Sequence, residues 1–196
     1  NWIGRYGKDT WEDATIKIDG AGVFPDMEET QITVRGRGNS SWDQNYSSKN
    51  PYRIKFAEKV KPFGLTKGKN WVLLANKQGG SLTTNAIAMK IADMAESAAC
   101  NHIIPVELYV NNQYRGSYNF TEKVGFANNS IDVEDEAKAV LLELDSYYDE
   151  PYRFHSDIFK EPVNIKAPDF DDPELVTELT FDDIKDGFNL LCNATR

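Results

Sequence analysis

Three basic side chains close to two glycines are the residues of this sequence with the clearest potential for chemistry. Arg35 and Arg37 flank Gly36, Gly38 follows, and Lys55 lies further along in an alternating segment. Glycines let backbone N–H groups approach phosphate oxygens, while arginine offers a planar fork and lysine a point charge. These residue types predict a phosphate site. The same pattern also fits turn glycines beside a solvated sheet face.

Two strands are expected to position these cations. Apolar and polar side chains alternate in residues 32–36 and again in residues 52–56. Successive side chains of a strand point to opposite faces, so Arg53 and Lys55 should share the face opposite the apolar residues. A loop rich in Ser, Asn and Asp joins the two segments. The resulting hairpin is expected to direct Arg37 and Lys55 toward one shared pocket.

A third strand is expected to bring a polar side chain to the edge of the same site. Residues 71–76 are apolar up to Asn76, which is the profile of a buried strand with a polar tip. Asn76 is therefore a candidate ligand contact. Further strands are predicted at residues 14–18, 106–110, 114–120, 140–145 and 163–165. Asn111-Asn112 is expected to join the strands at 106–110 and 114–120 in a tight hairpin, because asparagine tolerates positive φ.

Two helices complete the pattern. The first is predicted over residues 81–99 with Ser81 as its N-cap, because apolar residues recur there at helical spacing. Its stripe of Ile87, Ile91 and Met94 is expected to pack in the core. A second helix is predicted to start after Thr180, a suitable N-cap.

Length and composition limit the classes of function. The 196 residues carry 40% apolar residues and a formal charge of −9, with a pI near 4.8. An acidic chain argues against nucleic acid as a partner, so any phosphate site must be local. No apolar run approaches the roughly 18 residues of a membrane span. Cys100 and Cys192 match no metal spacing, and the pattern fits either one disulfide or two free thiols.

Two carboxylates offer a different chemistry. Glu143 and Asp145 fall on one face of the strand predicted at 140–145, separated by roughly 6–7 Å. Carboxylates at such spacing serve glycoside hydrolysis or bind a divalent cation, although a solvated acidic strand face has the same pattern. His102 is expected to cap the preceding helix or lie on the surface, and His155 has no carboxylate at triad spacing, so neither is predicted to act as a base.

Several sequence blocks resemble the CotH family of atypical protein kinases, first known from bacterial spore coats. The blocks are RGRGNSSW at 35–42, KNPYRIKF at 49–56, WVLLAN at 71–76, NNQYRGSYNFTEKV at 111–124 and LLELD at 141–145. The resemblance implies an α+β fold in which residues 1–124 form an antiparallel sheet with one packed helix, like a protein-kinase N-lobe. Residues 125–196 would hold a linker, additional strands and the incomplete start of a second lobe.

The resemblance also implies ATP and Mg²⁺ as cofactors. The nucleotide contacts it implies are Arg35, Arg37, Lys55, Asn76, Glu122 and Val124. Lys55 would pair with the α and β phosphates and Arg37 would cover the phosphates from the loop. Residues 122–124 would border the adenine through backbone groups. The partner of Lys55 stays open, because Glu96 is the sole glutamate of the predicted helix and lies near its far end.

Catalysis is expected to need residues outside this sequence. The family's metal-binding and catalytic aspartates belong to an Asn-x-Asp element and a Trp-Asp-Phe-Asp element, and this sequence contains neither. The catalytic residues are therefore expected beyond Arg196. This polypeptide alone is expected to bind nucleotide weakly at most and to transfer no phosphoryl group.

Three functions remain open from the sequence. The first is a CotH-like kinase that phosphorylates Ser or Thr of a coat or secreted protein. The second is a non-catalytic binding or cell-envelope module on the same fold, and the third is a carboxylate-dependent glycoside hydrolase using Glu143 and Asp145. The resemblance favours an extracytoplasmic, cell-surface or spore-coat location.

Overall fold

The computed structural model describes residues 8, 10–38, 40–42, 49–76, 81–97, 99–171 and 177–195. Backbone contacts divide the chain into two compact units. Unit 1 is Asn1–Val124 with Asn128–Ser130, and unit 2 is Gly125–Ala127 with Ile131–Arg196. Strands and helices occur in both units, and the α+β class predicted from the sequence is confirmed.

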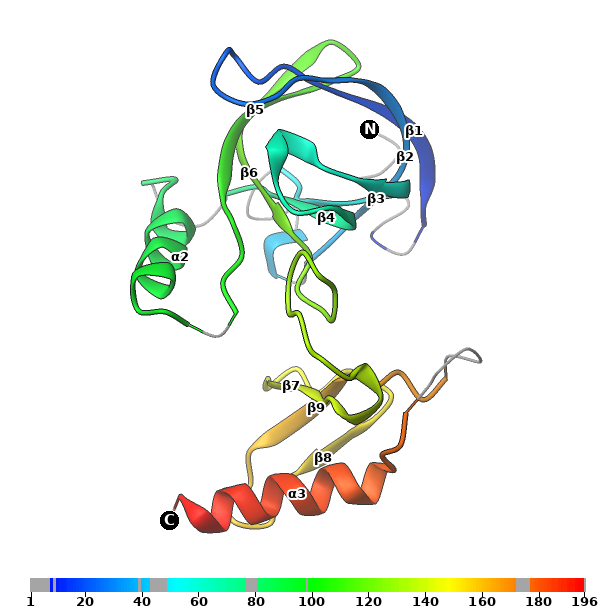
Figure 1. Ribbon diagram of the computed structural model, residues 1–196, viewed down its shortest axis with the longest axis vertical. Coiled ribbons are helices and arrows are strands. Elements are labelled where there is room, and N and C mark those ends of the chain that lie inside the picture. Colours follow the sequence, from blue (N-terminus) through cyan, green and yellow to red (C-terminus); the bar gives the residue numbers. More distant parts are fainter. Residues whose placement is uncertain are drawn as a thin grey trace. The chain divides into compact units, whose positions relative to one another are not determined.

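Unit 1 is built on a curled six-stranded antiparallel sheet (Figure 1). Its strands are β1 (Glu12–Ile18), β2 (Met27–Gly36), β3 (Tyr52–Val60), β4 (Gly68–Leu74), β5 (Ile104–Val110) and β6 (Gln113–Glu122), in the spatial order β1-β2-β3-β4-β6-β5. Short 3₁₀ turns occur at Ser40–Trp42 and Pro62–Gly64. Asn111 and Asn112 join β5 to β6 with φ of 50° and 60°, which confirms the predicted tight hairpin.

The core of unit 1 lies on one face of this sheet. Ile54, Trp71 and Phe120 come from three neighbouring strands and are almost fully buried. The Trp71 ring stacks on Phe120 with centroids 5.2 Å apart, and its Nε1–H donates to the Gly68 carbonyl at 3.1 Å. The alternation predicted for β3 is confirmed, because its apolar residues are buried while Arg53 is half-buried and Lys55 exposed.

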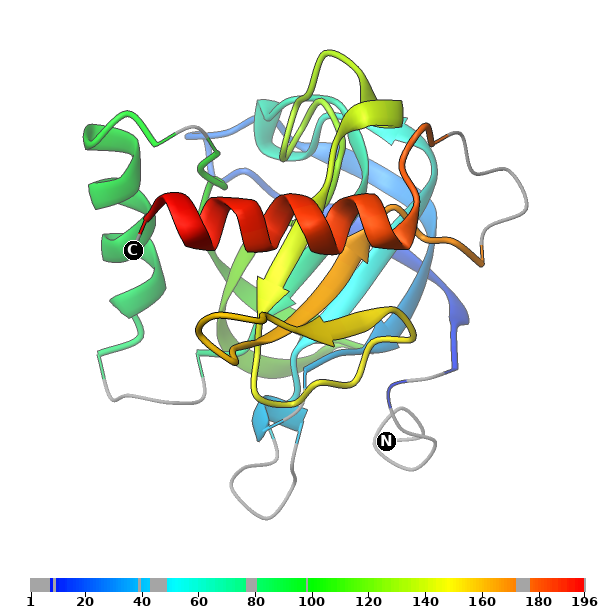
Figure 2. The same cartoon turned by 90° about the horizontal axis from the view of Figure 1, so that it is seen from below.

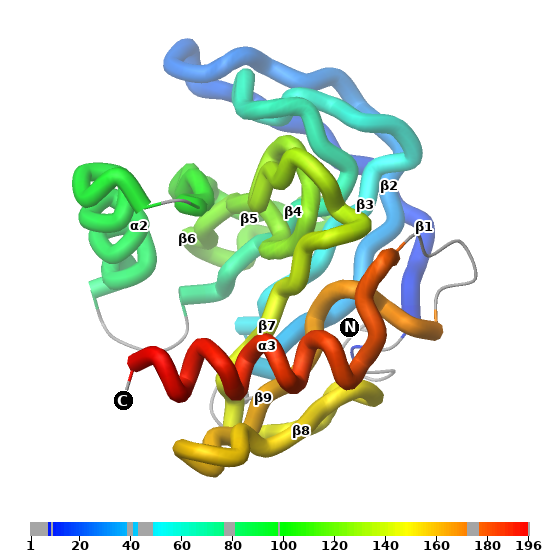
Figure 3. The backbone as a smooth tube through the Cα atoms, turned by 60° about the horizontal axis from the view of Figure 1, so that its bottom comes forward, coloured from blue at the N-terminus to red at the C-terminus, as the bar shows by residue number. Residues whose placement is uncertain are grey.

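The helix of unit 1, α2 (Thr84–Met94), differs from its prediction. It starts at Thr84 after the N-cap Thr83, so Ser81 is not the cap, and it ends at Met94, short of residue 99. The apolar stripe predicted to pack in the core is exposed: Ile87 by 56%, Ile91 by 61% and Met94 by 74%. The half-buried positions are Ala86, Met89 and Ala92. The tube in Figure 3 shows α2 beside the curled sheet rather than inside it.

Unit 2 is a three-stranded antiparallel sheet covered on one face by a helix (Figure 2). Its elements are β7 (Leu141–Leu144), β8 (Arg153–His155), β9 (Pro162–Ala167) and α3 (Phe181–Ala194), with a 3₁₀ turn at Glu136–Lys138. The strand order is β7-β9-β8. Phe154, Val163 and Ile165 of the sheet and Ile184 of α3 form its core.

The start of α3 matches the predicted N-cap. The Thr180 hydroxyl accepts the Asp183 N–H at 3.2 Å, and the Asp183 carboxylate accepts the Thr180 N–H at 2.9 Å. This reciprocal pair is a capping box. The Thr180 hydroxyl also donates to the Asp183 carboxylate at 2.6 Å, and this bond together with the one from the Thr180 N–H lowers the pKa of Asp183.

Thr180→Ala is expected to destabilise α3 by about 1 kcal/mol, because it removes the hydroxyl that satisfies a helix-end donor. Amide hydrogen exchange should then quicken roughly fivefold in α3 and stay unchanged in β3 and β4 of unit 1. Thr180→Ser, which keeps the hydroxyl, is the matched control. An α3 exchange rate that is the same in both variants would contradict a role for the cap.

Two other expectations concern cysteines and membranes. Cys100 and Cys192 are both free thiols in this structure. No helix in the described part of the chain is long and apolar enough to cross a bilayer.

Candidate functional site

A cavity of about 360 Å³ in unit 1 is a candidate binding site. It lies where the loop after β2, the end of β4 and the start of α2 meet. Its polar wall contains Arg37, Asn76, Thr84 and Asn85, and Leu74 and Leu82 contribute to its apolar wall. Two of the six residues predicted to contact a nucleotide, Arg37 and Asn76, therefore line the same cavity.

Arg37 contributes a half-buried positive charge to this cavity. Its backbone N–H donates to the Pro51 carbonyl at 3.3 Å, which extends the β2–β3 ladder past Gly36. Burial lowers the pKa of the guanidinium. Among the described residues, no carboxylate forms an ion pair with Arg37. A partly desolvated cation without a counter-charge favours an incoming anion.

Asn76 contributes an amide donor. It follows β4 with φ of 49°, a left-handed conformation that asparagine tolerates better than most residues. Its Oδ1 accepts a hydrogen bond from the Asn119 amide at 3.0 Å, which fixes the orientation of the side chain. Its Nδ2 is buried and has no partner within the described chain. A ligand oxygen in the cavity would satisfy that donor.

The first residues of α2 add backbone donors. Thr84 and Asn85 are the first two residues of the helix, and both line the cavity. The N-cap Thr83 makes no side-chain capping hydrogen bond. The N–H groups of a first helical turn lack partners in the helix and carry the positive end of its dipole. Arg37, Asn76 and this helix start therefore all offer positive charge or hydrogen-bond donors, which suits an anionic ligand.

The two glycines of the loop have backbone roles. A Cβ at Gly36 would lie 2.2 Å from a ring carbon of Trp42, so only glycine leaves room for that ring. Gly38 has φ of 89°, where other residues are strained. These demands match the alternative in which the glycines serve turn geometry. Residues 39 and 43–48 of the loop lie outside the described residues.

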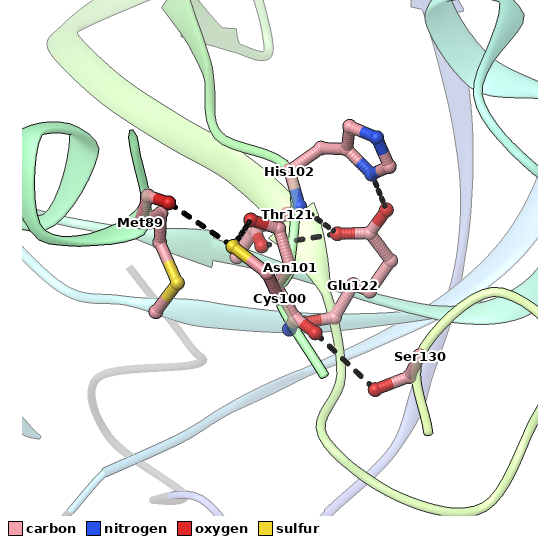
Figure 4. Close-up of polar contacts among 7 residues, drawn as sticks. All are labelled: Met89, Cys100, Asn101, His102, Thr121, Glu122 and Ser130. Carbon is pink, nitrogen blue, oxygen red and sulfur yellow. Dashed lines mark hydrogen bonds and ion pairs between the residues drawn. The ribbon is translucent and has the colours of Figure 1, made fainter. Parts of the chain in front are cut away.

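Glu122 occupies a different place, at the end of β6 (Figure 4). Its side chain is fully buried, and its carboxylate accepts hydrogen bonds from the His102 N–H at 2.8 Å and the Thr121 hydroxyl at 3.3 Å. The His102 ring Nδ1 lies 2.8 Å from the other carboxylate oxygen. Glu122 thus anchors the segment that leads into β5. This pairing is a contact that the sequence did not indicate.

The backbone of the segment predicted to meet adenine is partly engaged within the protein. The Asn101 side-chain amide donates to the Glu122 carbonyl at 2.9 Å, and the Ser130 hydroxyl donates to the Asn101 Oδ1 at 3.3 Å (Figure 4). The Lys123 N–H donates to the Asn70 carbonyl at 3.2 Å. Val124 is 57% exposed. An adenine contact at residues 122–124 stays a prediction, and Val124 is the residue there with the most open surface.

Comparison with known families decides the membership of this chain. Residues 34–195 match the family described as CotH kinase protein. The chain belongs to the CotH kinase family. No curated protein and no solved structure matches it.

Lys55 and Arg35 of the CotH chain do not line the cavity. Lys55 is exposed on β3, opposite Thr33 of β2. Protein kinases carry the phosphate-binding lysine on the third strand of the lobe, and Lys55 also lies on the third strand of unit 1, which here directly follows the glycine loop. Arg35 is half-buried beside Trp11. Phosphate contacts by Lys55 and Arg35 therefore stay predictions.

The two carboxylates considered for hydrolysis both have partners in unit 2 of the CotH chain. Glu143 forms an ion pair with Lys166 at 3.3 Å, and Lys166 also pairs with Glu150. Asp145 follows β7, and its carboxylate accepts the Tyr147 N–H at 3.0 Å, as in an Asx-turn. These contacts give no support for a joint catalytic role of Glu143 and Asp145.

Proposed function

We propose that unit 1 binds the phosphate groups of ATP in the cavity beside Arg37. A CotH kinase would use this site to phosphorylate Ser or Thr of a coat or secreted protein. The observation that carries the proposal is the half-buried Arg37 guanidinium, which faces the cavity without a carboxylate partner in the described chain. Membership of the CotH kinase family also supports a role in ATP binding.

The residues of the cavity would act by position and charge. Arg37 would hold two phosphate oxygens through its planar fork. Asn76 would donate its buried Nδ2–H, and the first N–H groups of α2 would face the same anion. Donors fixed before the ligand arrives need little reorganisation when charge enters, which is the property that phosphoryl-transfer sites exploit.

The described residues fit the phosphate groups better than the metal. No group of three His, Cys, Asp or Glu side chains in the described part of the chain is placed to hold a metal ion. We therefore assign no step to Mg²⁺ through these residues. Binding and orientation of the phosphates are the part of the kinase reaction that this chain would supply.

Arg37→Ala is expected to weaken ATP binding roughly tenfold to hundredfold, because one charge-assisted contact contributes about 1.5–3 kcal/mol. Asn76→Ala should weaken ATP binding several-fold, because a neutral hydrogen bond contributes about 1 kcal/mol. Isothermal titration calorimetry with Mg²⁺-ATP measures both. Lys59→Ala is the charge-matched control, since Lys59 is exposed further along β3 and outside the cavity.

Equal ATP affinities in wild type, Arg37→Ala and Lys59→Ala would contradict phosphate binding in this cavity. A separate Lys55→Ala titration tests the lysine predicted from the sequence. Loss of affinity there would show that its long side chain reaches the phosphates from outside the cavity wall.

A further inference from the structure

Arg35 and Arg53 form a second cationic feature, on the polar face of the sheet in unit 1. They lie directly opposite each other on β2 and β3, so their side chains emerge on the same face. Both guanidiniums stand over the same indole, with the Arg35 carbon 5.1 Å and the Arg53 carbon 5.4 Å from the Trp11 ring centroid. Trp11 therefore holds the two cations side by side.

This arrangement concentrates like charge. Directly opposed residues of the same sign destabilise an antiparallel pair. Arg37 lies two positions beyond Arg35, which places it on the same side by strand alternation. Burial together with the charges of Arg35 and Arg37 lowers the pKa of Arg53. No carboxylate forms an ion pair with Arg35 or Arg53 among the residues that the structure describes. An external anion would relieve this repulsion.

The hydrogen bonds of the two arginines leave donors available. Arg35 Nη1 donates to the Lys8 carbonyl at 2.8 Å, and Arg53 Nη2 makes a long contact of 3.4 Å with Asn70 Oδ1. The Nε of each is buried without a partner in the described chain. Each guanidinium has five N–H groups, so most of their donor capacity is not used by these contacts. Both residues are only half-buried, so part of each side chain remains exposed to solvent.

We propose that Arg35 and Arg53 form a second phosphate subsite, which together with Arg37 holds a chain of linked phosphates. The proposal rests on the proposed function and extends it from one phosphate contact to a polyphosphate. Arg35 and Arg37 are two positions apart along the chain, or roughly 6–7 Å. Linked phosphates can span that separation, whereas a single orthophosphate engages one position at a time. Arg53 would then be a ligand contact that the sequence did not assign.

Calorimetry with inorganic tripolyphosphate and orthophosphate tests the subsite without a nucleoside. Wild type is expected to bind tripolyphosphate at least about tenfold more tightly than orthophosphate, because a further charge-assisted contact contributes. Arg53→Gln should reduce that ratio to below about threefold. Lys59→Gln removes one exposed charge from the same strand and should leave the ratio unchanged. Equal binding of both anions by wild type would overturn the subsite.

Titration with ATP separates this inference from the proposed function. If Arg53→Gln binds ATP as tightly as wild type does, the subsite is overturned while nucleotide binding stands. If ATP does not bind but tripolyphosphate binds in an Arg53-dependent way, the subsite stands and the nucleotide function fails. Arg35→Gln provides a second variant, and far-UV circular dichroism without ligand checks that each variant is folded.

Discussion

Trp71→Ala is expected to lower the free energy of unfolding of unit 1 by about 3–5 kcal/mol. Trp71 is completely buried, and its removal would leave a cavity between β3, β4 and β6. The stacking on Phe120 and the hydrogen bond to the Gly68 carbonyl would be lost together. Urea unfolding followed by amide hydrogen exchange measures the loss separately in the two units.

Trp71→Phe is the matched control for that prediction. It keeps an aromatic ring against Phe120 and removes the Nε1 donor and part of the volume, so a smaller loss of about 1–2 kcal/mol is expected. Exchange in β7 and β9 of unit 2 should not change in either variant. An alanine variant as stable as wild type would contradict the central place of Trp71 in the core.

Glu122→Ala is expected to destabilise unit 1 by about 2–4 kcal/mol, because it leaves buried donors without an acceptor and opens a small cavity. The affected donors are the His102 N–H and the Thr121 hydroxyl. Hydrogen exchange should quicken most at residues 101–104 and at the end of β6. The cause is the loss of the anchor between these segments (Figure 4).

Glu122→Gln separates the hydrogen bonds from the charge. The amide keeps one oxygen acceptor for the His102 N–H, so a loss of only about 1 kcal/mol is expected. His102→Ala is a further control, since it removes the ring but keeps the backbone donor. If Glu122→Ala were no less stable than Glu122→Gln, the buried carboxylate would not be the anchor described.

The local patterns of the sequence were sufficient for most strands of unit 1. Alternation in residues 32–36 and 52–56 predicted β2 and β3 and the face of their side chains. Asn111-Asn112 predicted the β5–β6 hairpin, because asparagine accepts positive φ. These signals succeed because they depend on neighbouring residues alone.

The same reasoning failed for α2 because periodicity does not say which face of a helix meets the protein. Ile87, Ile91 and Met94 share one face, as predicted, yet that face is exposed. The half-buried face carries Met89 and the smaller Ala86 and Ala92. The pattern of hydrophobic residues alone therefore predicted the wrong face of α2 as the buried one.

The candidate site was predicted in part for a related reason. Strand parity predicts that Arg37 and Lys55 share one face, but it does not give their separation along the hairpin, and Arg37 lines the cavity whereas Lys55 does not. The opposition of Arg35 and Arg53 depends on the strand register, which the sequence does not state. The pair of Glu122 and His102 joins residues twenty positions apart, and only tertiary structure brings them together.

An experimental structure of the chain with a non-hydrolysable ATP analogue tests the central claim most directly. The proposal predicts a phosphate group within hydrogen-bonding distance of the Arg37 guanidinium, with Asn76 Nδ2 and the first N–H groups of α2 facing it. A nucleotide bound elsewhere on unit 1, with Arg37 facing an empty cavity, would contradict it.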